Sequence, residues 1–175
     1  LFLSKVKEFL DFEQNKLCIG YTEHPFETSL SVNDVRIANH VYENDLISGV
    51  LSLIHEYGHA LYYMQTNPIY NGTALFSHGG YGVNESQSRL LENHIGRSRP
   101  FWEQMYPELK NIFPDALLIY IAPPSIEELK RRLINRGTES IEKINSRLEI
   151  AKEELEKNDF FDYVIINDVV DEAYL

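Results

Sequence analysis

The segment His55-Glu56-Tyr57-Gly58-His59 constrains this chain more than any other, because its chemistry requires one particular secondary structure. Residues 45–66 form a long apolar-periodic stretch, which predicts a helix with Asp45 near its start and Asn67-Pro68 at its end. Positions four apart lie on one face of a helix, so His55 and His59 can direct both imidazoles at a single metal ion. Glu56 then lies where it can take a proton from a water at that ion. The segment predicts a metal-dependent hydrolase whose third protein ligand comes from elsewhere in the chain.

The remainder of the first two thirds predicts helices and short strands around a cleft. Apolar spacing indicates helices over 1–16, 84–95 and 101–112, and β-prone pieces at 17–21 and 35–37 indicate strands. Four glycines within 69–83 indicate a loop. The helix expected over 84–95 follows the one that carries the histidines, and it starts with a carboxylate, Glu85.

The last third has a different pattern. The apolar run over 116–122 predicts a strand buried on both faces, as in a parallel sheet. Ser125 and Glu128 form a capping box for a charged helical stretch that reaches about residue 158. A second apolar strand is expected over 163–166. We therefore expect two domains, 1–112 and 113–175, the second with strand–helix–helix–strand order.

Charge and cysteine content exclude several classes of protein. The net charge of −11 argues against nucleic-acid or anionic-membrane binding, because phosphates would be repelled. The single cysteine, Cys18, allows neither an internal disulfide nor a thiolate metal site. No apolar run has the ~20 residues that a membrane helix needs, and the start has no signal-peptide pattern. We expect a cytoplasmic protein, and the absence of an initiator Met suggests that the chain begins inside a longer one or was trimmed.

Residues 17–106 resemble the carboxypeptidase Taq family of zinc metallocarboxypeptidases. The resemblance is carried by ordered motifs: His24-Pro25-Phe26, 34–37, 55–59, 85–87, and the run 88–98 followed by Phe101-Trp102. It implies a mainly α-helical, zincin-like core, a Zn²⁺ cofactor (with Co²⁺ as another candidate), a peptide substrate and a homodimer. It also implies site residues, with Glu56 as general base, His55, His59 and Glu85 as metal ligands, and His24, Arg36 and Arg89 as substrate-binding or supporting groups.

Two positions depart from the family pattern. Asn84 stands where the family has a histidine, and Ala38 where it has a threonine. Arg89 and Glu92 either orient the metal ligands or form an ion pair on a helix surface.

Residues 113–175 resemble the C-terminal part of guanylate kinase. The segments 121–125, 129–132, 136–140, 146–148 and 161–168 carry this resemblance. It implies contacts with the phosphates and adenine of ATP and GMP, through Arg132, Arg136, Arg147 and Asn167. The chain contains no GxxxxGK[ST] phosphate loop, which argues against phosphoryl transfer. A metallocarboxypeptidase is therefore the first hypothesis; a guanylate kinase-like nucleotide-binding fragment and an inactive chimeric fragment are the alternatives.

Overall fold

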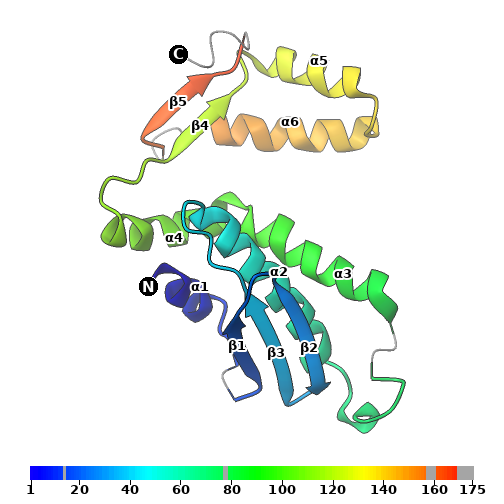
Figure 1. The fold of residues 1–175 in the computed structure, drawn as a ribbon. Coiled ribbons are helices and arrows are strands. Elements are labelled where there is room, and N and C mark those ends of the chain that lie inside the picture. Colours follow the sequence, from blue (N-terminus) through cyan, green and yellow to red (C-terminus); the bar gives the residue numbers. More distant parts are fainter. Residues whose placement is uncertain (14, 77–78, 157–160, 169–175) are drawn as a thin grey trace. The chain divides into compact units, whose positions relative to one another are not determined.

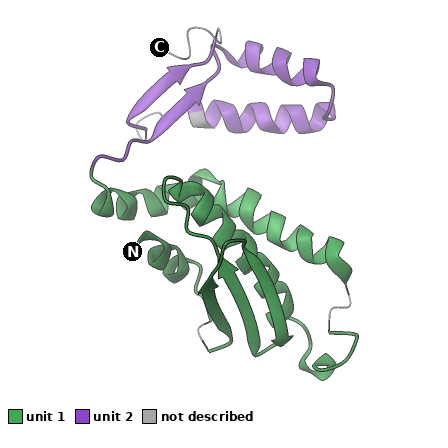
Figure 2. Cartoon of the chain, in the orientation of Figure 1, with its two compact units in different colours: residues 1–114 green, residues 115–175 purple. Residues whose placement is uncertain are grey.

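The computed structural model describes residues 1–13, 15–76, 79–156 and 161–168. The chain divides into two compact units, Leu1–Pro114 and Asp115–Leu175, which Figure 2 colours green and purple. Each unit has its own core, and the two are described separately.

The first unit combines a small sheet with a helical layer (Figure 1). Helix α1 (Phe2–Phe9) precedes strands β1 (Leu17–Tyr21), β2 (Phe26–Ser31) and β3 (Asp34–Asn39). The strand order is β1-β3-β2, with β1 parallel and β2 antiparallel to the central β3, so β2 is an edge strand. Helix α2 (Leu46–Met64), the 3₁₀ turn η1 (Pro68–Tyr70), α3 (Gly80–Leu90), the π-helical segment η2 (Leu91–Gly96) and α4 (Arg99–Ile112) follow.

Helix α2 is the centre of this unit. It begins where Asp45 caps it, the carboxylate accepting a 2.9 Å hydrogen bond from the backbone N–H of Ser48. Its apolar residues join α1, β1, β3, η2 and α4 in one hydrophobic core, in which Val50, Leu53 and Ile54 are almost fully buried. Because the neighbouring elements pack against several of its sides, polar side chains on α2 are held in fixed positions.

Helices α2 and α3 approach so closely that no side chain fits at one point between them. A Cβ atom added to Gly58 would lie 2.5 Å from the Cα of Ser88, and Ser88 is fully buried. Real Cβ atoms do not reach such distances, so this packing requires glycine at position 58. The close approach brings the polar residues of α3 beside the histidines of α2.

The second unit contains two parallel strands, β4 (Ile119–Ala122) and β5 (Tyr163–Ile166), and two helices, α5 (Ile126–Arg136) and α6 (Ile141–Glu156). Ser125 caps α5 by accepting a 3.1 Å bond from the N–H of Glu128. Gly137 ends α5 in the left-handed conformation (φ 63°) and so separates the two helices. Leu133, Ile144 and Leu148 form the small core of this unit.

The structure corrects several predictions about individual elements. The first helix ends at Phe9 rather than near 16, because the chain turns at Asp11, which has φ 51°. Helix α3 begins at Gly80, within the expected loop, and the edge strand β2 was not expected. The predicted ends of the last helical stretch and of the second domain fall on residues that the structure does not describe.

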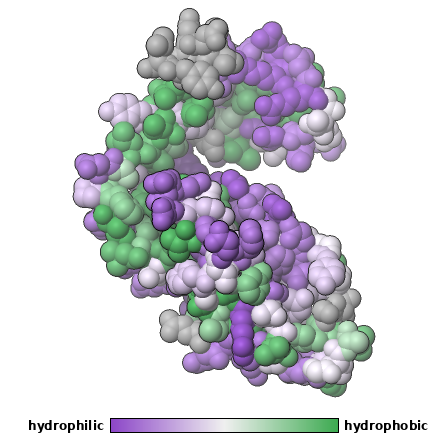
Figure 3. Space-filling view, in the orientation of Figure 1, coloured by the Kyte–Doolittle hydropathy of each residue, from purple (hydrophilic) through white to green (hydrophobic). Residues whose placement is uncertain are grey.

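The largest correction concerns the strand over 116–122. It begins only at Ile119 and is not buried on both faces: Ile119 is 47% and Ile121 65% exposed. Within the described residues its sheet has two strands, and much of both strands stays at the surface, where Figure 3 shows hydrophobic (green) side chains. A parallel pair of this kind is normally covered on both sides.

Candidate metal centre

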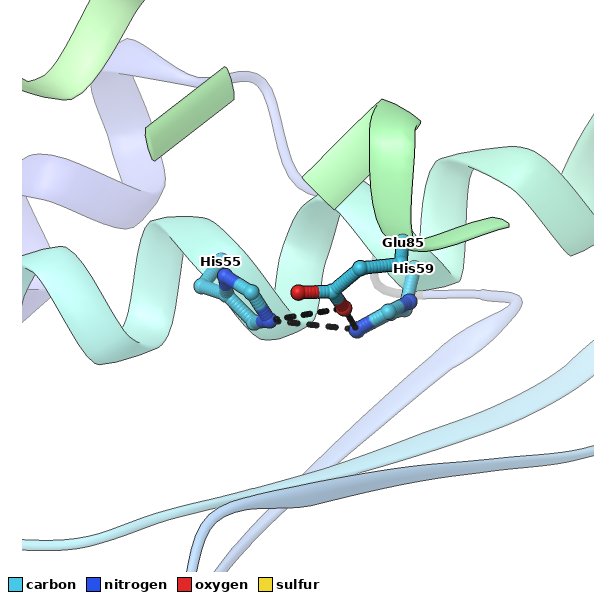
Figure 4. Close-up of side chains that lie close together, drawn as sticks. All are labelled: His55, His59 and Glu85. Atoms are coloured by element: carbon cyan, nitrogen blue, oxygen red, sulfur yellow. Dashed lines mark hydrogen bonds and ion pairs between the residues drawn. The ribbon is translucent and has the colours of Figure 1, made fainter. Parts of the chain in front are cut away.

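His55, His59 and Glu85 converge on one point between α2 and α3 (Figure 4). The Nε2 atoms of the two histidines lie 3.2 Å apart. An Oε2 atom of Glu85 lies 3.5 Å from the Nε2 of His55 and 3.3 Å from that of His59. The three ligand atoms thus fit within 4.8 Å of one another, and we call this group the His–His–Glu cluster.

The outer nitrogen of each imidazole already has a hydrogen-bond partner. The Nδ1 of His55 lies 2.9 Å from a carboxylate oxygen of Glu92, and the Nδ1 of His59 lies 2.5 Å from the Oδ1 of Asn84. Both partners are acceptors, so in a neutral imidazole Nδ1 carries the hydrogen and Nε2 carries the lone pair. Two imidazole lone pairs and a carboxylate oxygen then face one another without a hydrogen between them, an arrangement that a cation stabilises.

The donor set fits a divalent transition metal. Two imidazoles and one carboxylate, with room for a further ligand, form a typical catalytic zinc site. The cluster borders a cleft of about 660 Å³ whose lining includes Glu27, Glu56 and Tyr63. A fourth ligand or a substrate therefore has access from this side.

Glu56 is a buried carboxyl group at the border of this cleft, only 7% exposed. Burial, followed by the negative charges of Glu27 and Glu85, raises the pKa of Glu56 to about 7. A carboxyl group with such a pKa can both accept and return a proton near neutral pH.

Arg89 joins the two carboxylates of the site. Its Nε donates a 2.7 Å hydrogen bond to Glu85, and its Nη1 lies 3.5 Å from Glu92. Burial alone would raise the pKa of Glu85, but the hydrogen bonds from Arg89 and Ser88 act against it, and the pKa lies below its usual value. Glu85 is therefore ionised at neutral pH and available to a cation.

The structure does not bring every candidate residue of this unit to the cleft. His24 is exposed and does not line the cleft, whereas its motif neighbours Pro25 and Phe26 both do. Arg36 lies on the exposed side of β3, where Asp34 accepts two hydrogen bonds from its guanidinium at 2.8 and 2.9 Å.

The four nucleotide-binding candidates all lie in the second unit. Arg132 donates to the backbone carbonyls of Asn167 (3.0 Å) and Asp168 (3.3 Å), so this side chain ties α5 to the end of β5. Arg147 donates a 2.7 Å hydrogen bond to Glu139. Arg136 is exposed at the end of α5.

Sequence reasoning missed the parts played by Asn84, Gly58 and Glu27. The sequence marks Asn84 only as a departure from a motif. Glu27 lies one residue after the motif His24-Pro25-Phe26. Glu27 is half-buried in the cleft, where burial raises the pKa of its carboxyl group. The spacing of Asn84 from Ser88, one helical turn, was a signal that both face the same neighbour.

A histidine pair one helical turn apart, a glutamate from the following helix and a buried glutamate beside them define a site of the metallopeptidase class. The chain belongs to the carboxypeptidase Taq (M32) metallopeptidase family, whose model matches residues 2–143. That match continues past the predicted domain boundary at 112/113, and no comparison shows the predicted resemblance of the later segment to guanylate kinase.

Curated relatives and solved structures agree with this family. The chain is 41% identical over 92 residues to thermostable carboxypeptidase 1 of Thermus thermophilus, and 43% identical over 96 residues to that of Pyrococcus furiosus. These matches cover 53% and 55% of this chain. The crystal structure of an M32 carboxypeptidase from Deinococcus radiodurans superposes with a TM-score of 0.59 at 39% identity, over 65% of this chain and 23% of that one. The relatives are carboxypeptidases, so the family is one of enzymes.

The chain spans only 18% and 19% of the length of these two curated relatives. In the part of the chain that the structure describes, no helix combines the length and the apolar character needed to cross a membrane.

Proposed function

We propose that this chain carries the catalytic core of a metallocarboxypeptidase that removes C-terminal residues from peptides. The observation that carries the proposal is the His–His–Glu cluster, in which three acceptor atoms from two helices lie within 4.8 Å beside the buried Glu56. His55, His59 and Glu85 hold the metal, and the cleft beside them takes the peptide.

We assign the metal as Zn²⁺, with Co²⁺ as a second ion that the same donors accept. Imidazole nitrogen and a single carboxylate suit zinc, whereas Ca²⁺ and Mg²⁺ prefer sites made only of oxygen. When bound, such an ion polarises the carbonyl group of the scissile bond and makes a water molecule more acidic.

Glu56 performs the proton transfers in this proposal. Its carboxylate takes a proton from the attacking water as the water oxygen bonds to the carbonyl carbon. It then returns the proton to the nitrogen of the leaving residue as the C–N bond breaks. The pKa of about 7 suits both steps, since the group is neither too weak a base nor too weak an acid.

The test compares metal content and hydrolysis in three proteins. The unmodified chain is expected to bind about one zinc and to release the last residue of a short blocked peptide. Glu56→Gln is expected to keep the zinc and to lose hydrolysis, since it removes only the base, whereas His59→Ala is expected to lose both. Hydrolysis that survives Glu56→Gln would reject this role for Glu56. A chain without bound zinc or cooperative unfolding would be the inactive fragment of the third hypothesis.

A second candidate function is nucleotide binding by residues 113–175. It is supported by the hydrogen bond from Arg132 to the carbonyl of Asn167, which puts two of the four candidate residues side by side. The guanidinium of Arg132 already serves protein acceptors, and this weakens the case for a phosphate contact. Binding of ATP at millimolar concentration that Arg136→Ala abolishes would support the candidate, and no binding at that concentration would reject it.

The homodimer suggested by the family resemblance is a separate proposal. Sedimentation of the chain at several concentrations tests it, with a single species of about one chain mass as the contrary result.

A further inference from the structure

The two histidines of the His–His–Glu cluster are held by chemically different partners. The partner of His55 is Glu92, a carboxylate on the π-helical segment η2. The partner of His59 is Asn84, a neutral amide on α3. Both partners are buried, with exposed fractions of 8% and 6%. Water therefore competes little for these hydrogen bonds.

Glu92 is itself fixed in place. The Nη2 of Arg97 donates a 2.7 Å hydrogen bond to its Oε1, which leaves Oε2 directed at the Nδ1 of His55. The guanidinium of Arg97 at one oxygen and the imidazole of His55 at the other make Glu92 an acceptor through both of its oxygens. A carboxylate can only accept, so the imidazole must place its hydrogen on Nδ1.

The amide of Asn84 is buried beside His59. Its Oδ1 atom lies 2.5 Å from the Nδ1 of His59. An amide oxygen can only accept, so this Nδ1 carries the hydrogen.

We infer that Glu92 and Asn84 are positioning residues that set both imidazoles in the Nδ1-protonated tautomer, so that each Nε2 faces the metal position before any ion arrives. This inference rests on the proposed metal site. Partners of this kind orient the ligand rings and raise their basicity, and removing one typically weakens metal binding by roughly 10- to 100-fold. Because Glu92 is charged and Asn84 is neutral, the loss of Glu92 has the larger effect on metal affinity.

The first experiment needs no metal. In chelator-treated protein labelled with ¹⁵N at histidine, at about pH 8.5 where imidazole is neutral, NMR reports which ring nitrogen carries the hydrogen. We expect Nδ1–H in both rings of the unmodified chain. Glu92→Leu is expected to release His55 alone and Asn84→Leu to release His59 alone. A mixture of tautomers in the unmodified chain, or no change in the variants, would overturn the inference.

The second experiment measures Zn²⁺ affinity by competition with a chromophoric chelator. Glu92→Leu and Asn84→Leu are expected to bind zinc roughly 10- to 100-fold more weakly. Asn84→Asp is expected to bind at least as tightly as the unmodified chain, because it keeps the acceptor and adds a charge. Glu92→Gln tests the role of Glu92 if the leucine variant does not fold. It keeps an acceptor for His55 and is expected to lose affinity with its tautomer preserved.

A matched control is Glu103→Leu. It removes a carboxylate on α4 that accepts a hydrogen bond from Arg99 and lies outside the cluster. Its zinc affinity is expected to equal that of the unmodified chain. If zinc binding survived His55→Ala and His59→Ala, the proposed metal site would be wrong. The NMR experiment on metal-free protein would still test the positioning role of Glu92 and Asn84, because it does not depend on zinc binding.

Discussion

At the scale of single residues, Tyr57 shows how differently α2 uses its two sides. It stands between His55 and His59 in the sequence, yet its ring is buried and stacks on Phe12 with a centroid distance of 3.8 Å. Burial, followed by the charges of Glu13 and Asp11, raises the pKa of its hydroxyl to about 12. The folded state therefore strongly prefers the neutral phenol.

This pKa predicts the behaviour of Tyr57→Phe in alkali. The pKa of Tyr57 in the folded state lies above the ordinary value of about 10. The contribution of the neutral phenol to the free energy of unfolding is therefore complete below pH 10 and is lost as the pH rises toward 12. The phenylalanine variant cannot ionise and keeps the ring stack. Near pH 11 the free energy of unfolding of this variant should exceed that of the unmodified chain by about 1 kcal/mol. Thermal unfolding of both proteins from pH 8 to 11.5 measures this, and parallel curves would contradict it.

Much of the site was predictable residue by residue. The spacing of His55 and His59 predicts their common direction, because a helix has a fixed period. Glu85 was identified through a motif, and the structure brings it within 3.5 Å of both imidazoles. The pairing of Asn84 with His59 was not predictable, because it depends on how far α3 is shifted along α2. Helical period gives no information about such a shift.

At the scale of elements, the crossing of α2 and α3 positions Glu85. We predict that Gly58→Ala destabilises the first unit, because its Cβ would lie 2.5 Å from the Cα of Ser88. Forcing the helices apart in this way typically costs roughly 1–3 kcal/mol. Zinc affinity should fall as well, since Glu85 moves with α3. Chemical unfolding and chelator competition measure the two effects.

Gly49→Ala is the matched control on the same helix. Its Cβ would meet neighbouring atoms only at 3.8 Å, an ordinary contact. Alanine in a helix is favoured over glycine by about 1 kcal/mol, so this variant should be as stable as the unmodified chain or more stable. If both alanine variants behaved alike, the close approach at Gly58 would not control stability.

Helix α5 supplies a prediction at acid pH. Hydrogen bonds from Arg131 and Arg132 lower the pKa of Glu128 to about 2. The stabilisation from this carboxylate is present above its ordinary pKa of 4.5 and is lost as the pH falls toward 2. The melting temperature of Glu128→Gln should therefore lie below that of the unmodified chain at pH 7, and the two should be equal near pH 2. A difference in melting temperature that persists at pH 2 would contradict this explanation.

The elements were predictable to different degrees. The long apolar-periodic helix α2 was recognised, because many residues contribute to one pattern, and the shorter helix expected over 101–112 corresponds to α4. The edge strand β2 was missed because its exposed and half-buried residues alternate without a strong apolar face. The exposure of β4 was also unpredictable, because an apolar run does not reveal whether anything covers it.

At the scale of the whole molecule, the residues of the His–His–Glu cluster all belong to the first unit, so zinc bound there should stabilise only that unit. We predict two unfolding transitions. Zinc at a concentration 100 times the Kd should raise the free energy of unfolding of residues 1–114 by about 2.7 kcal/mol. The transition assigned to these residues should therefore move to a higher temperature with zinc and to a lower one on chelation. Calorimetry with and without chelator measures both. A single transition that zinc shifts as a whole would contradict the independence of the units.

Leu133→Ala identifies the second transition. Leu133 is 6% exposed in the small core of α5 and α6, and its truncation should cost roughly 2–5 kcal/mol. Only the transition that zinc does not affect should move. The change of sequence pattern after residue 112 indicated a separate unit, and the structure divides the chain after Pro114.

The absence of a side chain at Gly58 also matters to anyone who would rebuild this site in another scaffold. Copying His55, His59 and Glu85 onto two helices would reproduce the donors without the distance between them. That distance is set by the contact of Gly58 with the backbone of Ser88. A designer would therefore have to transplant Gly58 and Ser88, which lie outside the His–His–Glu cluster, together with the three residues of the cluster.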